Sequence, residues 1–143
     1  MPEMLIRPYS PCDENAVVAL WERCGLTRPW NNPRKDLERK LKVDPGLFMV
    51  GLIKDKIAAS AMGGYEGHRG WVNYLAIEPD FQRQGLGRQM MQAIEKKLLT
   101  LGCPKVNLQV RTGNVKAIEF YKRIGYSPDE AVSMGKRLIE DKG

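Results

Sequence analysis

Histidine and cysteine are scarce in this sequence, and their scarcity excludes several kinds of site. The single histidine, His68, rules out a metal site built from several histidines. The three cysteines, Cys12, Cys24 and Cys103, are odd in number, widely spaced and form no Cys-x-x-Cys pair. The sequence therefore predicts neither a disulfide framework nor a zinc site, and we expect no metal cofactor. Reduced cysteines of this kind are typical of a cytoplasmic protein.

Long hydrophobic runs are also absent. The longest small apolar run, Ile57 to Met62, is interrupted by Ser60, and it falls far short of the roughly 18 apolar residues that a membrane span requires. The N-terminal residues 1–8 lack the basic segment, the apolar segment and the small-residue cleavage site of a secretory signal. The sequence thus favours a cytoplasmic location and predicts no membrane partner.

Neither sign of charge dominates, although the balance is positive. Lys and Arg number 23 against 17 Asp and Glu, which gives a net charge of +6. This excess indicates an anionic partner and leaves nucleic acid, anionic lipid and a phosphorylated cofactor open. A length of 143 residues, with 43% hydrophobic and 28% charged residues, is ordinary for a soluble globular protein. We expect residues 1–143 to form one domain with one core.

The hydrophobic pattern changes period along the chain and predicts a mixed α/β fold. Strands are predicted over residues 4–6, 47–53, 57–65, 71–77, 106–110 and, more weakly, 131–138. Helices are predicted from a cap at Asp13 to a stop at Gly25, over residues 34–42, from Leu86 to a stop at Gly102, and from a cap at Asn114 to a stop at Gly125. The expected architecture is one central sheet, mostly antiparallel and flanked by helices. The buried stripe of the third helix is predicted to be Leu86, Met90, Ile94, Leu98 and Leu101.

A glycine-rich turn between the strand 71–77 and the helix that starts at Leu86 is the most informative stretch. It contains Arg83, Gly85, Gly87 and Arg88. Glycines let the backbone turn tightly and approach a ligand, so several N–H groups can point at one anion. The start of a helix adds free N–H donors and a partial positive charge. The turn is therefore predicted to bind a pyrophosphate group.

Two other glycine motifs fail on spacing. A Rossmann fingerprint needs a third glycine where this chain has Met90, which is too large for close packing of helix on strand. A nucleoside-triphosphate P-loop ends in Gly-Lys-Ser or Gly-Lys-Thr, which is absent here. A turn that merely starts a helix would be the remaining, purely structural interpretation.

A second motif, about 30 residues downstream, makes the purely structural interpretation much weaker. It reads Asn114-x-x-Ala117-x-x-x-Tyr121-x-x-x-Gly125-Tyr126 and lies one helix after the next strand. Together with Gln82-x-x-Gly85-x-Gly87, it resembles the GNAT superfamily of acetyl-CoA-dependent N-acetyltransferases, and the resemblance covers nearly the whole chain. Further strings, at residues 21–24, 28–31, 63–65, 67–70 and 135–141, resemble the YpeA-type bacterial members.

The resemblance implies acetyl-CoA as co-substrate and assigns residues to it. In the family, the strand before the glycine turn lies along the pantetheine arm, which implies this role for Leu75, Ala76 and Ile77. The turn binds the pyrophosphate, mostly through main-chain N–H groups, which implies this role for Arg83, Gln84, Gly85, Leu86, Gly87 and Arg88. Asn114 would hydrogen-bond the cofactor, although a helix N-cap explains an asparagine by itself. Main-chain N–H groups of residues 75–77 would hold the oxyanion.

Tyr121 is implied both as a cofactor contact and as the general acid. Attack of an amine on a thioester expels a thiolate, whose thiol has a pKa of about 8.5. A phenol with a pKa of about 10 can protonate this thiolate at hydrogen-bond distance. The other interpretation is a tyrosine that packs its ring on the core beside Ala117 and Ile124.

The general base stays unassigned at this stage. Many relatives carry a carboxylate in the strand that corresponds to residues 105–110, where this chain has Gln109 between Asn107 and Arg111. Glu66 and Glu78 are the nearby carboxylates, and action through a water molecule is equally compatible with the sequence.

The acceptor is expected to be an amine of a small molecule, a protein or a peptide. In the family the first helices and their connecting loop border the acceptor cleft, which implies Trp21, Arg28, Trp30, Asn31, Tyr65 and Tyr74. Trp21 lies on a helical stripe and favours the core, whereas Trp30, in an irregular segment, favours the acceptor site. A homodimer is left open.

Two further functions are weighed against the acetyltransferase. One is an acyl-CoA-binding protein with little or no catalysis, which the missing strand carboxylate favours. The other is a nucleic-acid-binding module, which requires basic residues gathered on one surface. Lys and Arg are instead spread among acids, as in Glu95-Lys96-Lys97, so we expect no nucleic-acid partner.

Overall fold

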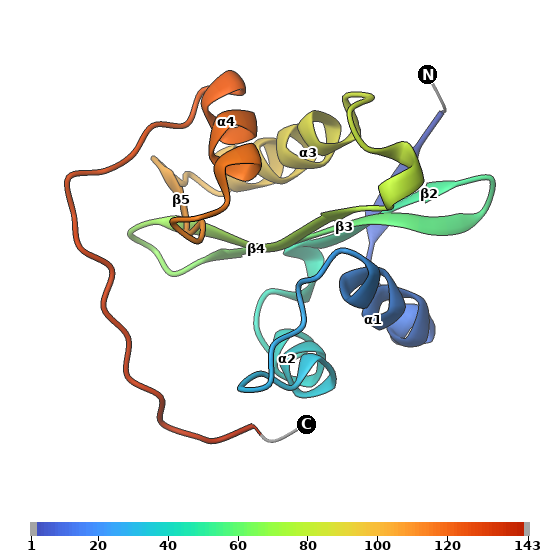
Figure 1. Cartoon of the computed structure of the whole chain (residues 1–143), viewed down its shortest axis with the longest axis horizontal. Coiled ribbons are helices and arrows are strands. Elements are labelled where there is room, and N and C mark those ends of the chain that lie inside the picture. Colours follow the sequence, from blue (N-terminus) through green and yellow to red (C-terminus); the bar gives the residue numbers. More distant parts are fainter. Residues whose placement is uncertain (1–2, 142–143) are drawn as a thin grey trace.

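One twisted sheet organises the computed structural model, which describes residues 3–141 (Figure 1). Its strands are β1 (Leu5–Pro8), β2 (Phe48–Ile53), β3 (Lys56–Tyr65), β4 (Gly70–Ile77) and β5 (Val106–Leu108), and they lie in sequence order across the sheet. Neighbours from β1 to β4 are antiparallel, whereas β4 and β5 are parallel. The predicted mixed α/β fold with a mostly antiparallel sheet is therefore confirmed.

Helices cover both faces of the sheet, as Figure 1 shows. Helices α1 (Glu14–Arg23) and α2 (Pro33–Lys40) lie on one face, and α3 (Leu86–Thr100) and α4 (Val115–Arg123) on the other. Short 3-10 turns occupy Pro11–Asp13, Pro45–Leu47 and Pro79–Phe81. Each face of the sheet buries its own apolar cluster, because a sheet with one uncovered face would leave half of its side chains in water. Within residues 3–141, no helix combines the length and the apolar character that crossing a bilayer requires.

Several predicted boundaries need correction. Helix α3 ends at Thr100, so Leu101 is 56% exposed and leaves the predicted stripe, while Met91 joins the buried side chains of the helix. The carboxylate of Asp13 does not cap α1; it accepts hydrogen bonds from the Ser10 N–H at 2.9 Å and from Arg7. Asn114 does cap α4, since its side chain accepts from the Ala117 N–H at 3.2 Å.

The strand predicted for residues 131–138 is wrong. Residues 127–141, here called the C-terminal segment, are extended but pair with no strand. Two features explain this: β5 offers only three residues, and Pro128 has no N–H to donate near the start of such a ladder.

Side-chain contacts hold the C-terminal segment instead. Near its start, Asp129 accepts from Lys105 at 2.8 Å, and Ser133 contacts Gln109. Further along, Arg137 donates to Asn31 at 2.8 Å. At its end, Asp141 accepts from two guanidinium nitrogens of Arg39 at 2.6 and 2.8 Å. The segment therefore runs from α4 on one face of the sheet to α2 on the other (Figure 1).

Strand β4 carries a bulge at Tyr74 and Leu75. Ser60 pairs with Ala76, and Met62 pairs with Asn73. Tyr74 and Leu75 on β4 therefore lie opposite a single residue of β3, Ala61. Tyr74 has a φ of 53°, a left-handed conformation that is strained for a residue with a bulky side chain. The bulge therefore needs support from its surroundings.

Buried contacts supply that support. The Tyr74 ring stacks on Trp21 with centroids 3.7 Å apart, and Trp21 is fully buried, as predicted. The Ser60 hydroxyl accepts from the Trp21 indole N–H at 2.9 Å and donates to the Tyr74 carbonyl at 2.8 Å. The Tyr74 hydroxyl donates to Asp36 at 2.7 Å. Helices α1 and α2 thus hold the bulge from below the sheet.

Helices α3 and α4 are joined closely at two points. A Cβ added to Gly87 would lie 2.9 Å from the Phe120 ring, so only glycine allows this approach. Further along α3, Glu95 accepts a hydrogen bond at 2.6 Å from the hydroxyl of Tyr126, which lies just beyond the end of α4. The packing of the two helices thus gives Gly87 a structural role in addition to the one that the sequence predicted.

Replacing Ser60 with alanine tests the support of the bulge. We expect Ser60→Ala to lower the free energy of unfolding by about 1–3 kcal/mol, because the Trp21 indole N–H and the Tyr74 carbonyl lose their shared partner. Urea unfolding followed by tryptophan fluorescence measures the change. Ser127→Ala, at an exposed position, is the control and should change stability by less than about 0.5 kcal/mol. Equal stabilities of Ser60→Ala and the control would contradict the role of Ser60.

The Gly87 contact can be tested by a double-mutant cycle. Gly87→Ala is expected to destabilise the chain by about 1–3 kcal/mol, because the new methyl group overlaps the Phe120 ring. Combined with Phe120→Leu, which makes room, the loss should be smaller than the sum of the two single losses. Strict additivity in urea unfolding would show that the two residues do not compete for space.

Candidate active site

A cavity of about 680 Å³ opens where β4 and β5 separate. The two parallel strands pair only from Gly70 with Val106 to Val72 with Leu108. Beyond that point β4 enters its bulge and β5 ends, so the predicted strand 106–110 is shorter than expected. The cavity is lined from one face of the sheet by residues of α2 and of the connection between α1 and α2, and from the other face by residues that follow β5 and by α4. It therefore connects the two helical layers.

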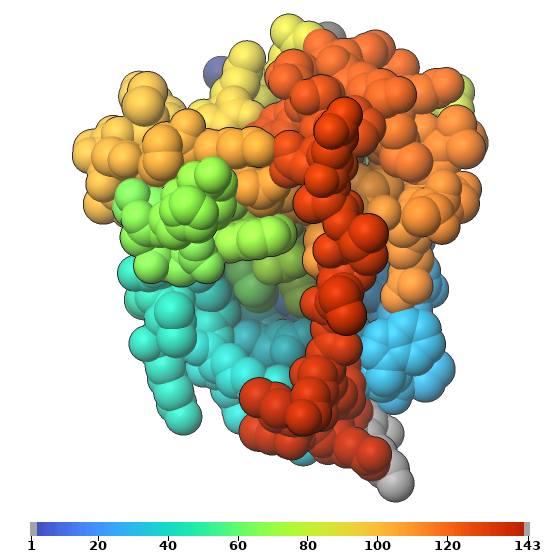
Figure 2. All heavy atoms as spheres, turned by 90° about the vertical axis from the view of Figure 1, so that its left-hand side faces the viewer, coloured from blue at the N-terminus to red at the C-terminus, as the bar shows by residue number. Residues whose placement is uncertain are grey.

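The C-terminal segment crosses the mouth of this hollow in Figure 2. Its contacts with Gln109 beyond β5, with Asn31 in the α1–α2 connection and with Arg39 in α2 place it over residues that line the cavity. The C-terminal segment, which is held at both of its ends, thus crosses the mouth of the cavity.

Tyr121 of α4 lines the cavity, as do Asn114 and Ala117 from the same helix or its cap. Its ring lies edge-on to Phe120 and Tyr126, with centroids 5.0 and 5.7 Å away. Burial raises the pKa of Tyr121 to about 12, so the phenol is protonated at neutral pH. Its hydroxyl donates to none of the other residues between 3 and 141, which leaves its proton available to a molecule in the cavity.

The glycine turn follows β4 and begins α3. Gln82 closes it, because its side-chain amide donates to the Ile77 carbonyl at 3.0 Å. Arg83 and Gly85 take left-handed conformations, with φ values of 64° and 81°. The first helical bond runs from the Gln89 N–H to the Gly85 carbonyl, so the N–H groups of residues 83–88 donate to no other backbone group in the described part of the chain. Six such donors at one helix start are a candidate anion site.

The side chains of the turn contribute little to its internal structure. Arg83 and Arg88 are exposed and make no ion pair within residues 3–141, and Gln84 and Gly87 are half-buried. Leu86 is fully buried in the core. None of the residues 83–88 lines the cavity, so the candidate anion site is separate from it, and β4, which contributes residues 72–75 to the cavity wall, leads along the chain to the turn.

The end of β4 links these two parts. Leu75 lines the cavity within the bulge, Ala76 is buried and pairs with Ser60, and Ile77 pairs with Ala59. The Ile77 carbonyl accepts from Gln82 and from the Cys24 thiol at 3.2 Å. Burial raises the pKa of Cys24, which lines the cavity, so this thiol is not a ready nucleophile.

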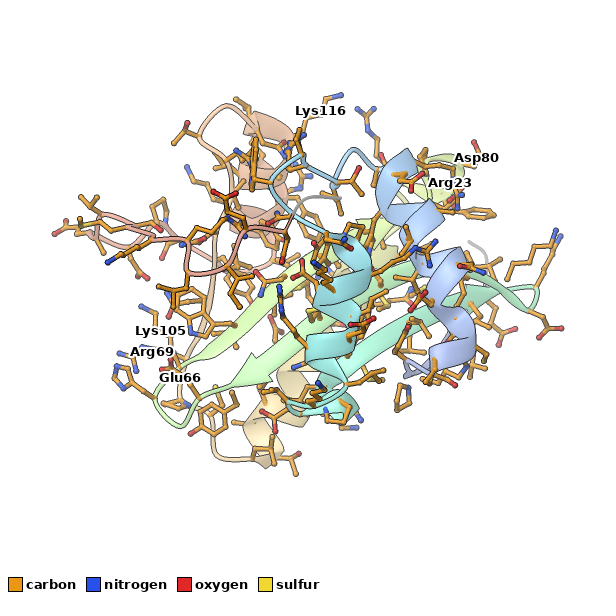
Figure 3. All side chains as sticks on the ribbon, turned by 90° about the horizontal axis from the view of Figure 1, so that it is seen from below. Arg23, Glu66, Arg69, Asp80, Lys105 and Lys116 are labelled. Atoms are coloured by element: carbon orange, nitrogen blue, oxygen red, sulfur yellow. The ribbon has the colours of Figure 1, made fainter. Side chains whose placement is uncertain are left out.

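The two carboxylates that the sequence offered as base do not reach the cavity. Glu66 lies in the β3–β4 turn, where it accepts from the Arg69 N–H at 3.1 Å, beside Lys105 and Arg69 in Figure 3. Glu78 lies past the other end of β4, where it forms a two-pronged ion pair with Arg23. Neither residue is part of the cavity wall, which includes Tyr121.

Asp36 is a site residue that the sequence analysis missed. It is the one carboxylate among the described residues of the cavity wall. It accepts from the Tyr74 hydroxyl at 2.7 Å and from Arg39 at 3.3 Å. Its helix, α2, is charged on all sides, so no pattern separates Asp36 from its neighbours before the fold is known.

The residues predicted to border the acceptor divide into three groups. Arg28, Asn31 and Tyr74 line the cavity. Trp30 stands beside it, half exposed, with the Arg111 guanidinium 5.2 Å from its ring centroid. Tyr65 instead donates to the Gly67 carbonyl in the β3–β4 turn and is outside the cavity wall.

Comparison with known proteins identifies the family. The model of the acetyltransferase (GNAT) family matches residues 13–126. An acetyltransferase of Pectobacterium atrosepticum is 47% identical over 139 residues, which is 97% of this chain and 99% of that protein. An acetyltransferase of Sodalis glossinidius is 46% identical over 140 residues, with the same coverage of both chains.

Solved structures agree with this assignment. Ard1 of Thermoplasma volcanium has a TM-score of 0.78 at 26% identity and covers 87% of this chain, and this chain covers 82% of it. The aminoglycoside N-acetyltransferase AAC(6')-Iy, solved in complex with CoA, has a TM-score of 0.79 at 15% identity, with 97% of each chain covered, and supports the fold alone. The family model, the bacterial relatives and the fold agree: this chain belongs to the GNAT acetyltransferase family.

Proposed function

We propose that the chain transfers the acetyl group of acetyl-CoA to a primary amine, which attacks the thioester directly while both substrates are bound. The observation that carries the proposal is the path along β4, with six free N–H donors at one end and a cavity with a protonated phenol at the other. A pyrophosphate fits the first part and a thioester with its acceptor fits the second. Acetyl-CoA supplies the activated acyl group.

The sequence-predicted residues each have a role toward this co-substrate in the proposal. Main-chain N–H groups of Arg83, Gln84, Gly85, Leu86, Gly87 and Arg88 would hold the pyrophosphate, with the exposed Arg83 and Arg88 side chains adding positive charge. Leu75, Ala76 and Ile77 would line the pantetheine arm, because the bulge and the separation of β5 uncover this edge of β4. Asn114, whose side chain also caps α4, would hydrogen-bond the same arm.

Tyr121 would act as the general acid. Its raised pKa keeps the proton on the phenol, and no described residue competes for that proton. A thiolate leaving toward Tyr121 would therefore meet a neutral donor in a poorly hydrated wall of the cavity.

Asp36 would hold the amine of the acceptor and take its proton. It replaces Glu66 and Glu78 in this role, because those carboxylates lie outside the cavity. A carboxylate at this place compensates for Gln109, which stands where many relatives carry an acid and here contacts Ser133.

One experiment separates transfer from mere binding. Calorimetry with acetyl-CoA tests the anion site, and thiol release with free amino acids, polyamines, antibiotics and peptide N-termini tests transfer. Binding without thiol release on any amine would favour an acyl-CoA-binding protein. Salt-sensitive DNA binding without acetyl-CoA binding would contradict both. A cytoplasmic location, one domain over residues 1–143 and a homodimer stay predictions.

Replacing Tyr121 with phenylalanine tests the acid. Tyr121→Phe keeps the ring, so we expect acetyl-CoA affinity to change by less than about twofold while kcat falls by about 100-fold. Because the pKa of Tyr121 is about 12, its protonated form persists on the alkaline side, and the ratio of wild-type to variant kcat should stay constant from pH 7 to about pH 10. An unchanged kcat would remove Tyr121 from the mechanism.

The role of Asp36 as the base is tested by comparing Asp36→Asn with Tyr74→Phe, a variant of its hydrogen-bond partner. Asp36→Asn is expected to lower kcat/KM by about 100-fold at neutral pH, because the amide does not accept a proton from an ammonium. Tyr74→Phe removes the hydrogen bond that Tyr74 donates to Asp36 but keeps the carboxylate, and should lose less than about tenfold. Equal losses in steady-state kinetics would mean that Asp36 acts through the bulge.

A further inference from the structure

Cationic side chains outnumber anionic ones in the wall of the cavity. Four cationic side chains, Arg28, Arg39, Lys40 and Arg111, line it against the single carboxylate of Asp36. Arg39 is matched, since it donates to Asp141 at 2.6 and 2.8 Å and to Asp36 at 3.3 Å. The other three make no ion pair with a residue between 3 and 141. We call Arg28, Lys40 and Arg111 the cationic wall.

Lys40 is the most telling member of the cationic wall. It is only 9% exposed, and its ammonium donates to no residue in the described part of the chain. The ammonium lies 3.6 Å from the point that a Cβ on Gly64 would occupy, so the absence of that Cβ leaves room beside it. Burial lowers the pKa of Lys40, and the more distant Asp44 only partly opposes this. The ammonium keeps some contact with solvent, because no fully buried side-chain nitrogen or oxygen among the described residues lacks a partner. A partly desolvated ammonium without an ion-pair partner is suited to bind an anion that enters the cavity.

Arg28 and Arg111 border the same space from the two sides of the sheet. Arg28 is half-buried in the connection between α1 and α2. Arg111 follows β5 and lies over the Trp30 ring, 5.2 Å from its centroid. Stacking on a ring positions a guanidinium while leaving its N–H groups free to bind a planar or tetrahedral anion.

The phosphates of acetyl-CoA do not account for this charge. The free N–H groups that suit a pyrophosphate lie at the start of α3, on the opposite face of the sheet from α2 (Figure 1). Arg28 and Lys40, which border the cavity on the α2 side, therefore face the other substrate.

We propose that the acceptor is a small primary amine that also carries a carboxylate or phosphate group, which Lys40, Arg28 and Arg111 bind while Asp36 receives the amine. This inference rests on the proposed acetyl transfer. Asp36 and Lys40 are four residues apart in α2, so they share one face of the helix and present opposite charges to one ligand. The C-terminal segment roofs the cavity, which favours a small molecule over a protein segment.

Matched pairs of acceptors test the proposal by thiol release. The pairs are β-alanine with β-alaninamide and glucosamine 6-phosphate with glucosamine, so that the carboxylate and the phosphate are examined separately. Each pair is measured on the wild type, on Lys40→Met, on Arg28→Gln and on the control Lys42→Met, whose lysine is exposed and outside the cavity wall. Calorimetry with acetyl-CoA shows that each variant keeps its co-substrate site.

The expected result is that at least one anionic acceptor has a kcat/KM at least about tenfold above its neutral partner. Lys40→Met and Arg28→Gln should each remove about 10- to 100-fold of that advantage through KM, while acetyl-CoA affinity and turnover of the neutral partner persist. Lys42→Met should behave as the wild type. Better turnover of the neutral partners, or an anionic advantage that survives both cavity variants, would overturn the inference and leave the acetyl transfer intact.

Absence of thiol release with every amine, despite acetyl-CoA binding, would instead overturn the transfer. Calorimetry of inorganic phosphate on the CoA-bound protein then tests whether the cationic wall binds an anion. Phosphate binding that Lys40→Met weakens at least about tenfold supports the site, and equal binding by both proteins overturns it.

Discussion

The hydrogen bond between Ser60 and the Tyr74 carbonyl is the contact on which the rest of the site depends. It fixes a left-handed tyrosine inside a strand, and that conformation ends the regular ladder of β3 with β4. Without the bulge, β4 would continue flat beside β5 and the edge of Leu75 would stay covered. The stack of Tyr74 on Trp21 adds apolar burial to the same point, so polar and apolar contacts stabilise one strained residue together.

The sequence predicted the layered fold because most of its elements carry local signals. Periodicity located the strands and helices, and glycines with positive φ, such as Gly25 and Gly125, end helices where expected. The strand at residues 131–138 failed because its apolar residues have β character but no partner edge, which local sequence does not show. The turn after β4 was predictable as a turn because glycines mark it in the sequence, and Gly85 has the positive φ that glycine allows. Asp36 and Lys40 were not, because six of the eight residues of α2 are charged and only the tertiary fold selects the three, Asp36, Arg39 and Lys40, that line the cavity.

Charge on this chain is divided between two sites with different chemistry. The start of α3 offers backbone dipoles and two exposed arginines, which suit a solvated pyrophosphate. The α2 side offers Lys40, a residue only 9% exposed, one helical turn from Asp36, and in such a less hydrated setting the charge of a ligand has a larger effect on its binding. Part of the net positive charge thus has a location, and the ion pairs of Arg7 with Asp13 and Arg23 with Glu78 show that much of the remainder is structural.

The two contacts between α3 and α4 have a geometric consequence. Gly87 lies against Phe120, and Tyr126, three residues beyond the end of α4, donates to Glu95 within α3. Both contacts fall in or after the second half of α4, so neither of them holds its first turn, which begins at the Asn114 cap. The Tyr121 phenol thus stands in the half of α4 that α3 supports.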